Sequence, residues 1–467
     1  MLHVNSGIPE SGLFGSAVAV GEGSRVPWRL SPEPFPMLPS TLESLERLGD
    51  DLLAFYRAAN RLYLSSVRGA APTWVARYLD QGKGQREVEL ARLRRTRGKL
   101  PLVIRPDLMA LGNGNFVATE LDAIPGGIGL LDALMQRYRE LGYQPAGDSR
   151  GLVGALAGAL IAESGMENPF VAVVVSDESE AYRPEMTWVG ERLNQFGVRA
   201  ITVHPRQIDY EGGRIVVRQD NNVEPVDLIY RFFELHDLKN IPNVELIVYA
   251  MKHRRVGVTP PLKLHLEEKS LLALFHHPEL EGFWKDEMGV ESRDRVRKVI
   301  PPTWIVDPAE VPPGAAITPP LEVDGLTVRR WTDLFDLTQR QRRLVLKPSG
   351  FSELAWGSRG VTVGHDANVE DWNDAVGRAL ESYPQVPYVL QPFYNSLRFK
   401  TSYYDFDAGE VKAFDARARF SPYYFVENDR ARMAGVLVTA CPASSKLLHG
   451  MADAVMVPAR ASPNASI

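Results

Sequence analysis

The sequence predicts a mixed α/β protein, of the α+β kind, with a Rossmann-like parallel sheet between an N-terminal helical region and a strand-rich final third. Three observations support this fold class. Strand-like and helical segments alternate between residues 166 and 258, as they do in β-α-β units. Apolar residues recur at helical spacing between residues 41 and 62. From residue 300 onward, strand-like segments dominate.

The amino-acid composition excludes some classes of binding partner. The 467 residues include 53 Lys and Arg and 58 Asp and Glu, for a net charge of −5, so no global positive field favours nucleic acid or an anionic membrane. Small molecules are the expected partners. The single cysteine, Cys441, allows no intramolecular disulfide and fits a reducing cytoplasm. No run approaches the roughly 18 apolar residues of a membrane span. We expect a cytoplasmic protein, and composition leaves its oligomeric state open.

The first hundred residues predict an arm and a helical region. Residues 1–40 are rich in Gly, Pro and Ser and indicate an extended or poorly ordered start. A long amphipathic helix then follows, with Ser40 or Thr41 placed to cap it. The basic stretch 87–97 is a second helix, whose charges we interpret as a solvated face.

The next segments predict a hairpin, two helices and the parallel sheet. Residues 101–104 and 116–121 are strands joined by a Gly-Asn-Gly-Asn turn. Helices are expected at 130–141 and 152–164. The alternating segments that follow are strands at 170–176, 198–203 and 227–233, with a helix at 186–196.

The remaining segments predict helices followed by a mainly antiparallel sheet unit. Helices are expected at 244–251, 267–276 and 369–382, and strands at 344–348, 360–364, 387–393, 399–406 and 410–420. The last ten residues indicate a loose tail. The predicted division is 1–100 (arm and helices), 101–165 (hairpin and helices), 166–258 (Rossmann-like domain), 259–450 (final sheet region) and 451–467 (tail).

The hairpin carries the first candidate site. Asp107 lies two residues after Arg105, and Glu120 lies two residues before Asp122, so each pair projects from one face of its strand. If the strands pair, one face carries three carboxylates and a guanidinium. Oxygen ligands without histidine or thiolate suit Mg²⁺. The alternative is the ion-paired solvent face of an ordinary hairpin.

A second candidate site is a lysine at the end of a strand followed by a Gly-rich loop. Such a loop can cover phosphate oxygens with backbone N–H groups and one cation. The order GxxxxGK[ST] is absent, so it is not a P-loop. An ordinary β-hairpin turn explains the glycines equally well. The candidate residues are Lys347, Ser349, Gly350, Gly357, Ser358 and Gly360.

Three further segments have both a functional and a structural explanation. Lys269 stands ahead of an apolar helix and could reach phosphate, but Glu267, Glu268 and Lys269 also fit a solvated helix start. The strand ending at Gln391 could present backbone groups to an adenine ring, although most such strands are core. Residues 230–234 place an arginine and a glutamate at a strand end, where they could face an acceptor substrate or simply pack.

Taken in order, residues 100–440 resemble the synthetase part of glutathionylspermidine synthases, which are ATP-grasp ligases. The residues that carry the resemblance are Arg105-Pro106-Asp107, Glu120-Leu121-Asp122, Pro260-Pro261 before Glu268-Lys269, Lys347 to Gly360, and Gln391. The resemblance implies an ATP-grasp fold in which residues 259–450 bind the nucleotide and the Rossmann-like part is a pre-ATP-grasp domain.

The resemblance also implies roles for individual residues, with ATP and Mg²⁺ as cofactors. Asp107, Glu120 and Asp122 would hold Mg²⁺, while Arg105 would face the γ-phosphate, together with Arg417 or Arg419. Lys269, Lys347 and the Gly-rich loop would contact phosphates, and Gln391, Pro392 and Phe393 would line the adenine. Asp122 stands where the family has asparagine, and the loop reads Trp-Gly-Ser-Arg-Gly instead of Gly-Arg-Glu-Gly. The family's substrates therefore do not transfer.

These expectations lead to one function and two alternatives. The leading hypothesis is an ATP-dependent carboxylate-amine ligase that forms an amide through an acyl phosphate, because a carboxylate must be activated before an amine can attack it. Phosphoryl transfer depends on positioning and charge neutralisation, which Arg, Lys and Mg²⁺ supply. The partners would be a small-molecule carboxylate and an amine. The alternatives are a non-catalytic nucleotide-binding protein and a small-molecule kinase.

Overall fold

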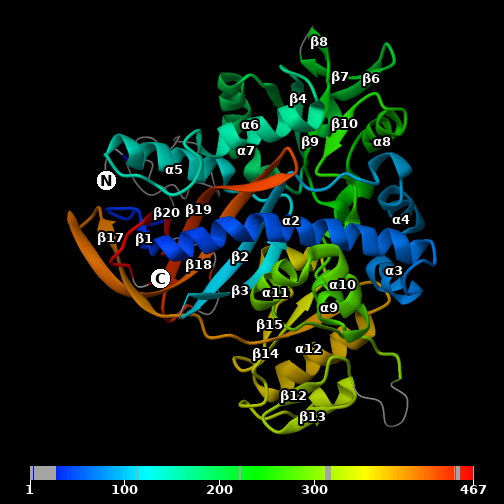
Figure 1. The fold of residues 1–467 in the computed structure, drawn as a ribbon, viewed down its shortest axis with the longest axis vertical. Coiled ribbons are helices and arrows are strands. Elements are labelled where there is room, and N and C mark those ends of the chain that lie inside the picture. Colours follow the sequence, from blue (N-terminus) through cyan, green and yellow to red (C-terminus); the bar gives the residue numbers. More distant parts are fainter. Residues whose placement is uncertain are drawn as a thin grey trace. The chain divides into compact units, whose positions relative to one another are not determined.

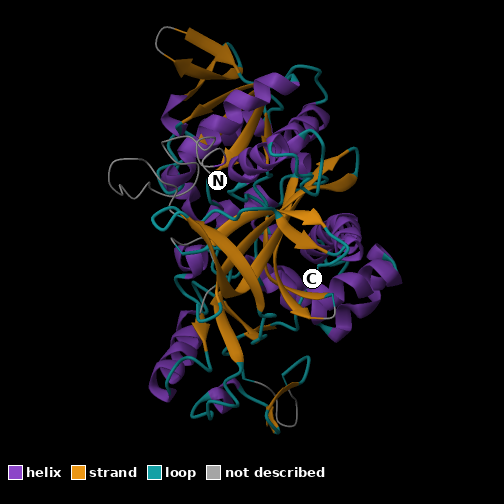
Figure 2. Cartoon of the chain, turned by 90° about the vertical axis from the view of Figure 1, so that its left-hand side faces the viewer, coloured by secondary structure: helices purple, strands orange, loops and turns teal. Residues whose placement is uncertain are grey.

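The computed structural model describes residue 4 and residues 28–112, 114–219, 222–310, 317–445, 448, 453–465 and 467, except for the side chains of 219 and 356–358. Strands and helices are mixed throughout this part of the chain, as the α/β class requires (Figure 2). The chain forms two compact units. The first unit comprises residues 1–53, 99–261 and 396–467, and the second comprises 54–98 and 262–395. Both units are discontinuous in sequence, unlike the linear division predicted above.

The first unit is built on a seven-stranded sheet in the order β1-β20-β19-β18-β2-β3, with β17 also beside β18 (Figure 1). All its neighbouring pairs are antiparallel except β1 and β20. The predicted hairpin is confirmed as β2 and β3, and it lies next to the long strand β18. The strands are β1 (Phe35–Met37), β2 (Val103–Gly112), β3 (Asn115–Asp122), β17 (Phe399–Asp405), β18 (Glu410–Glu427), β19 (Arg430–Pro442) and β20 (Val455–Ala461).

The first and last strands of this sheet in the sequence, β1 and β20, lie in segments that were not predicted to be strands. The strand β1 lies within the arm predicted for residues 1–40, of which residues 1–3 and 5–27 are outside the described part. The strand β20 pairs with both β19 and β1, so the loose tail predicted for the last ten residues is wrong up to Ala461. Sheet pairing satisfies the backbone N–H and C=O groups of these short segments, which local composition does not reveal.

Two helices cover one face of this sheet. The helices α5 (Ile128–Glu140) and α6 (Gly151–Ser164) match the predicted ranges closely and pack against β18, β19 and β20. Gly435 on β19 permits this close approach, because a Cβ atom there would lie 2.9 Å from both Leu152 Cδ1 and Met135 Sδ. The apolar faces of the two helices therefore bury against the sheet.

The predicted Rossmann-like sheet is present in the first unit. Its order is β10-β9-β4-β5, and every neighbouring pair is parallel. Three short antiparallel strands between β5 and β9 were not predicted. The elements are β4 (Phe170–Val175), α7 (Arg183–Leu193), β5 (Arg199–Val203), β6 (Ile208–Glu211), β7 (Arg214–Gln219), β8 (Asn222–Pro225), β9 (Leu228–Phe232), α8 (Val244–Lys252) and β10 (Gly257–Thr259).

The second unit contains an antiparallel sheet in the order β11-β16-β14-β15. The helix α12 covers one face through Trp372, whose indole N–H donates to the Leu334 carbonyl oxygen at 2.8 Å. The predicted final sheet unit is therefore divided, because β17 and β18 belong to the first unit. The elements are β11 (Trp304–Ile305), β12 (Leu321–Val323), β13 (Leu326–Val328), β14 (Leu344–Pro348), β15 (Thr362–Val363), α12 (Val369–Ser382) and β16 (Tyr388–Pro392).

The remaining helices belong mainly to the second unit. The helix α2 contributes its first part to the first unit and the rest to the second. None of the helices in the described part of the chain is both long enough and apolar enough to cross a membrane. The helices are α2 (Pro39–Val67), α3 (Thr73–Asp80), α4 (Gln85–Ala91), α9 (Ser270–His276), α10 (Glu281–Met288) and α11 (Val290–Val299).

Candidate functional site

The strands β2 and β3 bring the predicted hairpin residues together in the first unit. Arg105 lies opposite Asp122 in the register, and Asp107 lies opposite Glu120. Residues directly opposite in an antiparallel pair share a face, as do residues two apart along a strand. The period-two argument therefore places these four residues on one face correctly.

Asp107 is the most enclosed member of this group, with a side chain 4 % exposed. Its carboxylate accepts hydrogen bonds from Arg105 Nε at 3.0 Å and from Ser421 Oγ at 2.9 Å. Arg419 Nη1 lies 3.1 Å from its second oxygen. Burial alone would raise the pKa of Asp107, but the guanidinium groups of Arg105 and Arg419 hold that pKa below its usual range. Asp107 is thus ionised and charge-balanced by protein groups.

Asp122 has the opposite electrostatic character. Burial raises the pKa of its carboxyl group above the usual range, and Glu120 adds to the rise. Arg105 opposes the rise only in part, although its Nη2 atom lies 3.1 Å from Asp122 Oδ2. The backbone N–H of Ile124 donates to Asp122 Oδ1 at 2.8 Å. Because the Glu120 charge disfavours ionisation of Asp122, an added cation beside Asp122 would be stabilising.

These observations test the predicted magnesium ligands. Asp107 does not fit, because two guanidinium groups and a hydroxyl already surround it. Among the residues described, no group of three or more His, Cys, Asp or Glu side chains is arranged to hold a metal. Glu120 and Asp122 fit better, since Mg²⁺ is commonly held by one or two carboxylates together with substrate phosphates. The ligand set therefore stays a prediction, with Asp107 the weakest member.

The structure distinguishes between the two late arginines. Both lie on β18, two residues apart. Arg419 joins the Asp107 cluster, while the Arg417 guanidinium donates to the Ser445 carbonyl oxygen. The neighbouring Ser421 was not predicted at all, although it lies two residues beyond Arg419 on the same strand.

A turn at Gly126 and Gly127 contacts one side of the cluster around Asp107. Arg105 Nη1 and the Tyr423 hydroxyl both donate to the Gly126 carbonyl oxygen, at 3.1 and 2.6 Å. The next residue, Gly127, has φ of 90° and is the N-cap residue of α5. Glu185 accepts from the Gly127 and Leu130 N–H groups at 3.0 and 3.1 Å, which satisfies this helix N-terminus. Burial raises the pKa of Glu185 to about 7.

Three buried hydroxyl groups lie toward the carboxyl ends of the parallel strands. Ser176 follows β4, Thr259 ends β10, and Tyr230 on β9 is paired in register with Thr259. Each is about 1 % exposed, and none of the three hydroxyls has a hydrogen-bond partner within the described part of the chain. The carboxyl edge of an open parallel sheet is where α/β proteins bind ligands. Arg231, by contrast, is fully buried and donates to the Phe233 carbonyl oxygen at 2.7 Å.

The second unit brings together two of the predicted nucleotide-binding residues. Lys347 Nζ donates to Gln391 Oε1 at 2.9 Å, and Gln391 Nε2 donates to Thr303 Oγ1 at 3.0 Å. Lys347 and Gln391 lie on the same face of β14 and β16, since Val345 is opposite Gln391 and Lys347 is opposite Val389. This face is opposite to the one that α12 covers.

Ser349 and Gly350 have partners that the sequence did not suggest. The Ser349 hydroxyl and the Gly350 N–H both donate to Glu268 Oε2, the latter at 3.1 Å. The other oxygen of Glu268 lies 2.6 Å from Lys83 Nζ, and both side chains are at most 2 % exposed. The solvated helix start considered for Glu268 is therefore wrong. A Cβ atom at Gly350 would lie 2.0 Å from the Glu267 carbonyl oxygen, so only glycine fits there.

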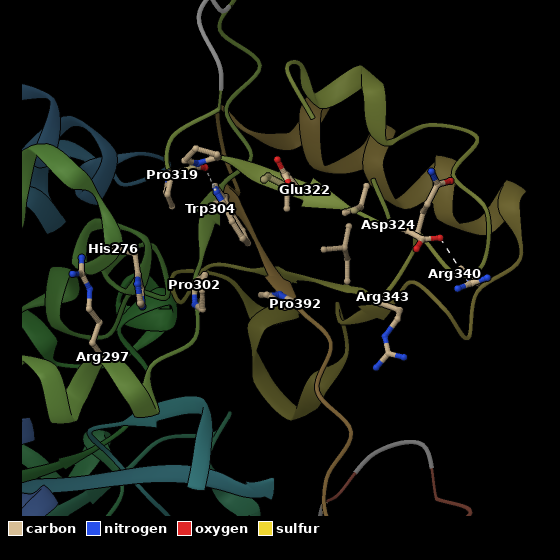
Figure 3. Close-up of a pocket in the computed structure, with 15 residues that line it drawn as sticks. His276, Arg297, Pro302, Trp304, Pro319, Glu322, Asp324, Arg340, Arg343 and Pro392 are labelled. Carbon is tan, nitrogen blue, oxygen red and sulfur yellow. Dashed lines mark hydrogen bonds and ion pairs between the residues drawn. The ribbon is translucent and has the colours of Figure 1, made fainter. Parts of the chain in front are cut away.

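The remaining predicted residues of the second unit are placed as follows. Lys269 is the residue immediately before α9. Gly360 donates its N–H to the Leu354 carbonyl oxygen at 2.9 Å. The centroids of the Phe393 and His365 rings are 4.1 Å apart, and Pro392 lines a cavity together with Trp304 and Leu344 (Figure 3). Gly357 and Ser358 are the last two residues of a 3₁₀ turn (Glu353–Ser358), and the Ser358 side chain is outside the described part.

Comparison with known proteins gives a fold likeness. No protein-family model matches the chain, and no curated protein sequence matches it. A glutathione synthetase-like effector from Globodera pallida, solved in its apo form, has 14 % sequence identity and a TM-score of 0.58. The alignment covers 98 % of this chain and 95 % of that one. At such low identity this likeness shows the fold alone.

A second solved structure is more distant. It is a protein from Methylobacillus flagellatus proposed to be a gamma-glutamylcysteine synthetase, with 11 % identity and a TM-score of 0.43. The alignment covers 91 % of this chain and 89 % of that one. The Globodera pallida structure alone shows that the α/β fold of this chain is shared with a synthetase-like protein. The resemblance to glutathionylspermidine synthases stays a prediction.

Proposed function

We propose that the protein is an ATP-dependent ligase of the ATP-grasp type, which joins a carboxylate to an amine. The fold likeness to a synthetase-like protein supports the class. The main support from the site is that the predicted residues gather in two clusters, Arg105 with Arg419 in the first unit and Lys347 with Gln391 in the second. A fold by itself does not require such side chains.

The proposed chemistry has two steps. A carboxylate oxygen of the substrate attacks the γ-phosphorus of ATP, and ADP leaves. The amine nitrogen then attacks the acyl carbon, inorganic phosphate leaves, and the nitrogen loses a proton. Both steps gain from alignment of the bound reactants and from fixed positive charge at the phosphoryl oxygens.

Each cluster has a role in this proposal. Lys347 and Lys269 would bind phosphate oxygens, and the segment from Gln391 to Phe393 would line the adenine. Arg105 and Arg419 would stabilise charge on the transferring phosphoryl group. Because Asp107 and Asp122 already fix the orientation of Arg105, that guanidinium needs little reorganisation. Glu120 and Asp122 would hold Mg²⁺, which neutralises phosphate charge.

The acceptor carboxylate or amine has a candidate location at the carboxyl edge of the parallel sheet. The unpartnered hydroxyl groups of Ser176, Tyr230 and Thr259 can each donate one hydrogen bond. Buried polar groups without partners are costly, and a polar substrate would satisfy them. Because these hydroxyl groups are neutral hydrogen-bond donors, the location fits either a carboxylate or an amide-rich substrate.

A coupled assay tests the proposal. ADP and phosphate release would be measured with MgATP over a panel of amino acids, short peptides and polyamines. We expect ADP release that requires both a carboxylate and an amine. Lys347→Ala should raise the KM for ATP by roughly tenfold or more, since one charge-assisted contact is lost. Lys298→Ala changes an exposed lysine of the same unit and should have no effect.

The alternatives give different outcomes in the same experiment. A small-molecule kinase would release ADP with a phosphorylated product and without inorganic phosphate. A non-catalytic nucleotide-binding protein would bind MgATP in calorimetry but show no turnover. Absence of any nucleotide binding would overturn the proposal.

A further inference from the structure

A buried ion pair in the second unit contacts three consecutive residues at the start of the Gly-rich loop that follows β14. Lys83 Nζ lies 2.6 Å from Glu268 Oε1, and the two side chains are 1 % and 2 % exposed. Glu268 Oε2 accepts hydrogen bonds from the Ser349 hydroxyl and from the Gly350 N–H, the latter at 3.1 Å. Lys83 Nζ also lies 5.5 Å from the centroid of the Phe351 ring, which is a cation–π distance.

Both members of the pair are held in place by other contacts. Lys83 lies in the short connection between α3 and α4, where its N–H donates to the Asp80 carbonyl oxygen at 3.1 Å. Glu268 lies two residues before the start of α9, and the first residue of that helix, Ser270, donates its N–H to Ser349 Oγ at 3.2 Å. All of these residues belong to the second unit. The pair therefore attaches the start of the loop to two segments that are distant from it in sequence.

Stability alone does not explain a buried ion pair at this position. Removing two charges from water is costly, and apolar side chains of similar size often stabilise a protein as well or better. An apolar pair cannot supply an acceptor for the Ser349 hydroxyl and the Gly350 N–H, or a cation beside the Phe351 ring. What the two charges add is therefore the attachment of the loop.

The attached residues follow directly after Lys347, whose ammonium group is proposed to bind phosphate. Lys347 lies in β14, and the N–H of Ser349, two residues later, donates to the Pro387 carbonyl oxygen at 2.8 Å. At its other end the loop returns through β15, which pairs with β14. Both ends of the loop are thus fixed by contacts within the second unit.

A loop that is already fixed loses less conformational entropy when it binds a ligand. Ordering the backbone of a single residue costs a factor of roughly five to thirty in an equilibrium constant. The hydrogen-bond donors of Ser349 and Gly350 are used by Glu268. These two residues therefore set the position of the loop and leave phosphate contact to Lys347.

We propose that Lys83 and Glu268 are positioning residues for nucleotide binding, which hold the start of the Gly-rich loop in place beside Lys347. This inference rests on the proposed function, which puts the ATP phosphates at Lys347. It adds two residues from outside the predicted nucleotide site, and both act through the loop without touching the nucleotide.

Nucleotide affinity in a double variant tests the proposal. Lys83→Met with Glu268→Leu removes both charges together, so the net charge near Lys347 is unchanged and the two apolar side chains can pack together. Calorimetry on the full chain would give the dissociation constant of the magnesium complex of a nonhydrolysable ATP analogue. We expect this constant to rise by roughly tenfold or more. Urea unfolding should stay much closer to that of the unaltered protein than it does in Glu268→Ala.

A matched control makes the same two changes in an exposed ion pair of the same unit. In α10, Lys285 Nζ lies 2.7 Å from Glu281 Oε1, and the two side chains are 41 % and 40 % exposed. Lys285→Met with Glu281→Leu should leave the dissociation constant unchanged, because exposed pairs contribute little. A purely structural role for Lys83 and Glu268 predicts equal affinity in the two double variants, and that result would overturn the proposal.

Ser349→Ala keeps the proposal testable if the first double variant is too unstable to study. This variant removes one contact to the loop and leaves the ion pair intact. We expect the dissociation constant to rise by roughly two- to fivefold. An unchanged constant in Ser349→Ala would overturn the proposal.

Hydrogen exchange without nucleotide separates this inference from the proposed function. Amide exchange in residues 349–355 should be roughly tenfold faster in Lys83→Met with Glu268→Leu, whereas exchange in α12 should not change. Unchanged exchange in 349–355 would overturn the inference even if the ligase assay succeeds. If the unaltered protein binds no nucleotide, the proposed function fails and this inference fails with it. Equal nucleotide affinity in the unaltered protein and the double variant overturns this inference alone.

Discussion

Asp107 in the first unit and Glu268 in the second are both enclosed carboxylates, yet they are stabilised differently. Asp107 has two guanidinium partners, and Arg105 has a second acidic neighbour in Asp122. The Glu268 carboxylate has a single cationic partner, Lys83, whose side chain is itself 1 % exposed. A shared charge network tolerates loss of one member, whereas an isolated buried pair leaves the survivor without compensation.

The largest expected effect comes from breaking the isolated pair. Glu268→Ala leaves the Lys83 ammonium buried without its counter-ion and removes the acceptor of Ser349 and Gly350. We expect a loss of about 3–5 kcal/mol in the free energy of unfolding, measured by urea titration. Replacing both members, Lys83→Met with Glu268→Leu, should restore much of the loss. A loss below 1 kcal/mol in Glu268→Ala would contradict the proposed difference between the Asp107 charge network and the isolated Lys83–Glu268 pair.

The second prediction uses pH to examine the first unit. Glu185 has a pKa of about 7 in the folded protein against an ordinary value of 4.5. The folded state therefore holds this proton more tightly than the unfolded chain. The free energy of unfolding should fall by about 3 kcal/mol from this group as the pH rises from 4.5 to 7.

Glu185→Gln checks the pH prediction, because an amide does not ionise. Urea unfolding at several pH values should show that the fall between pH 4.5 and 7 is much smaller in this variant. Glu279→Gln, at an exposed position, serves as the control and should keep the slope of the unaltered protein. Parallel pH profiles for Glu185→Gln and the unaltered protein would refute the assignment.

The third prediction tests the shared network directly. Asp107→Asn keeps the side-chain shape but removes the charge that faces Arg105 and Arg419. We expect a loss of about 2 kcal/mol, smaller than for Glu268→Ala, because Arg105 keeps Asp122 and Arg419 is 22 % exposed. Urea titration of the two variants side by side decides the order. The comparison fails if Asp107→Asn proves the more damaging substitution.

The smallest expected effects come from the serines of the two clusters. Ser421→Ala and Ser349→Ala each remove one hydroxyl donor to a carboxylate. We expect losses of about 1 kcal/mol in unfolding free energy for each. The Ser349 variant should show the larger loss, because Glu268 keeps only one charged partner, Lys83, whereas Asp107 keeps two guanidinium groups. A larger loss at Ser421 would reverse that ranking.

Local sequence patterns predicted much of the fold and part of the candidate site. The period-two spacing of Arg105, Asp107, Glu120 and Asp122 was sufficient to predict their shared face, because a hairpin is a local structure. The parallel sheet was also predictable, since its strands alternate with helices along the chain.

Contacts between distant segments could not be predicted in the same way. Arg419 reaches Asp107 only because β18 lies beside β2, and no local pattern encodes that neighbour. Likewise, Glu268 looked like a solvent-facing residue at a helix start, while its true environment depends on Lys83 from a far earlier segment. The short strands β6, β7 and β8 were missed as well, although they form a sheet of their own.

The late position of β18 in the sequence also affects the order in which the first unit folds during synthesis. Ser421 and Asp107 are 314 residues apart, so the hairpin leaves the ribosome long before its neighbouring strand exists. Until translation supplies β18, Asp107 lacks Arg419 and one edge of β2 stays open. Contacts of such long range slow folding, and an open strand edge invites aggregation. We therefore expect this sheet to be completed late, after most of the chain has been synthesised.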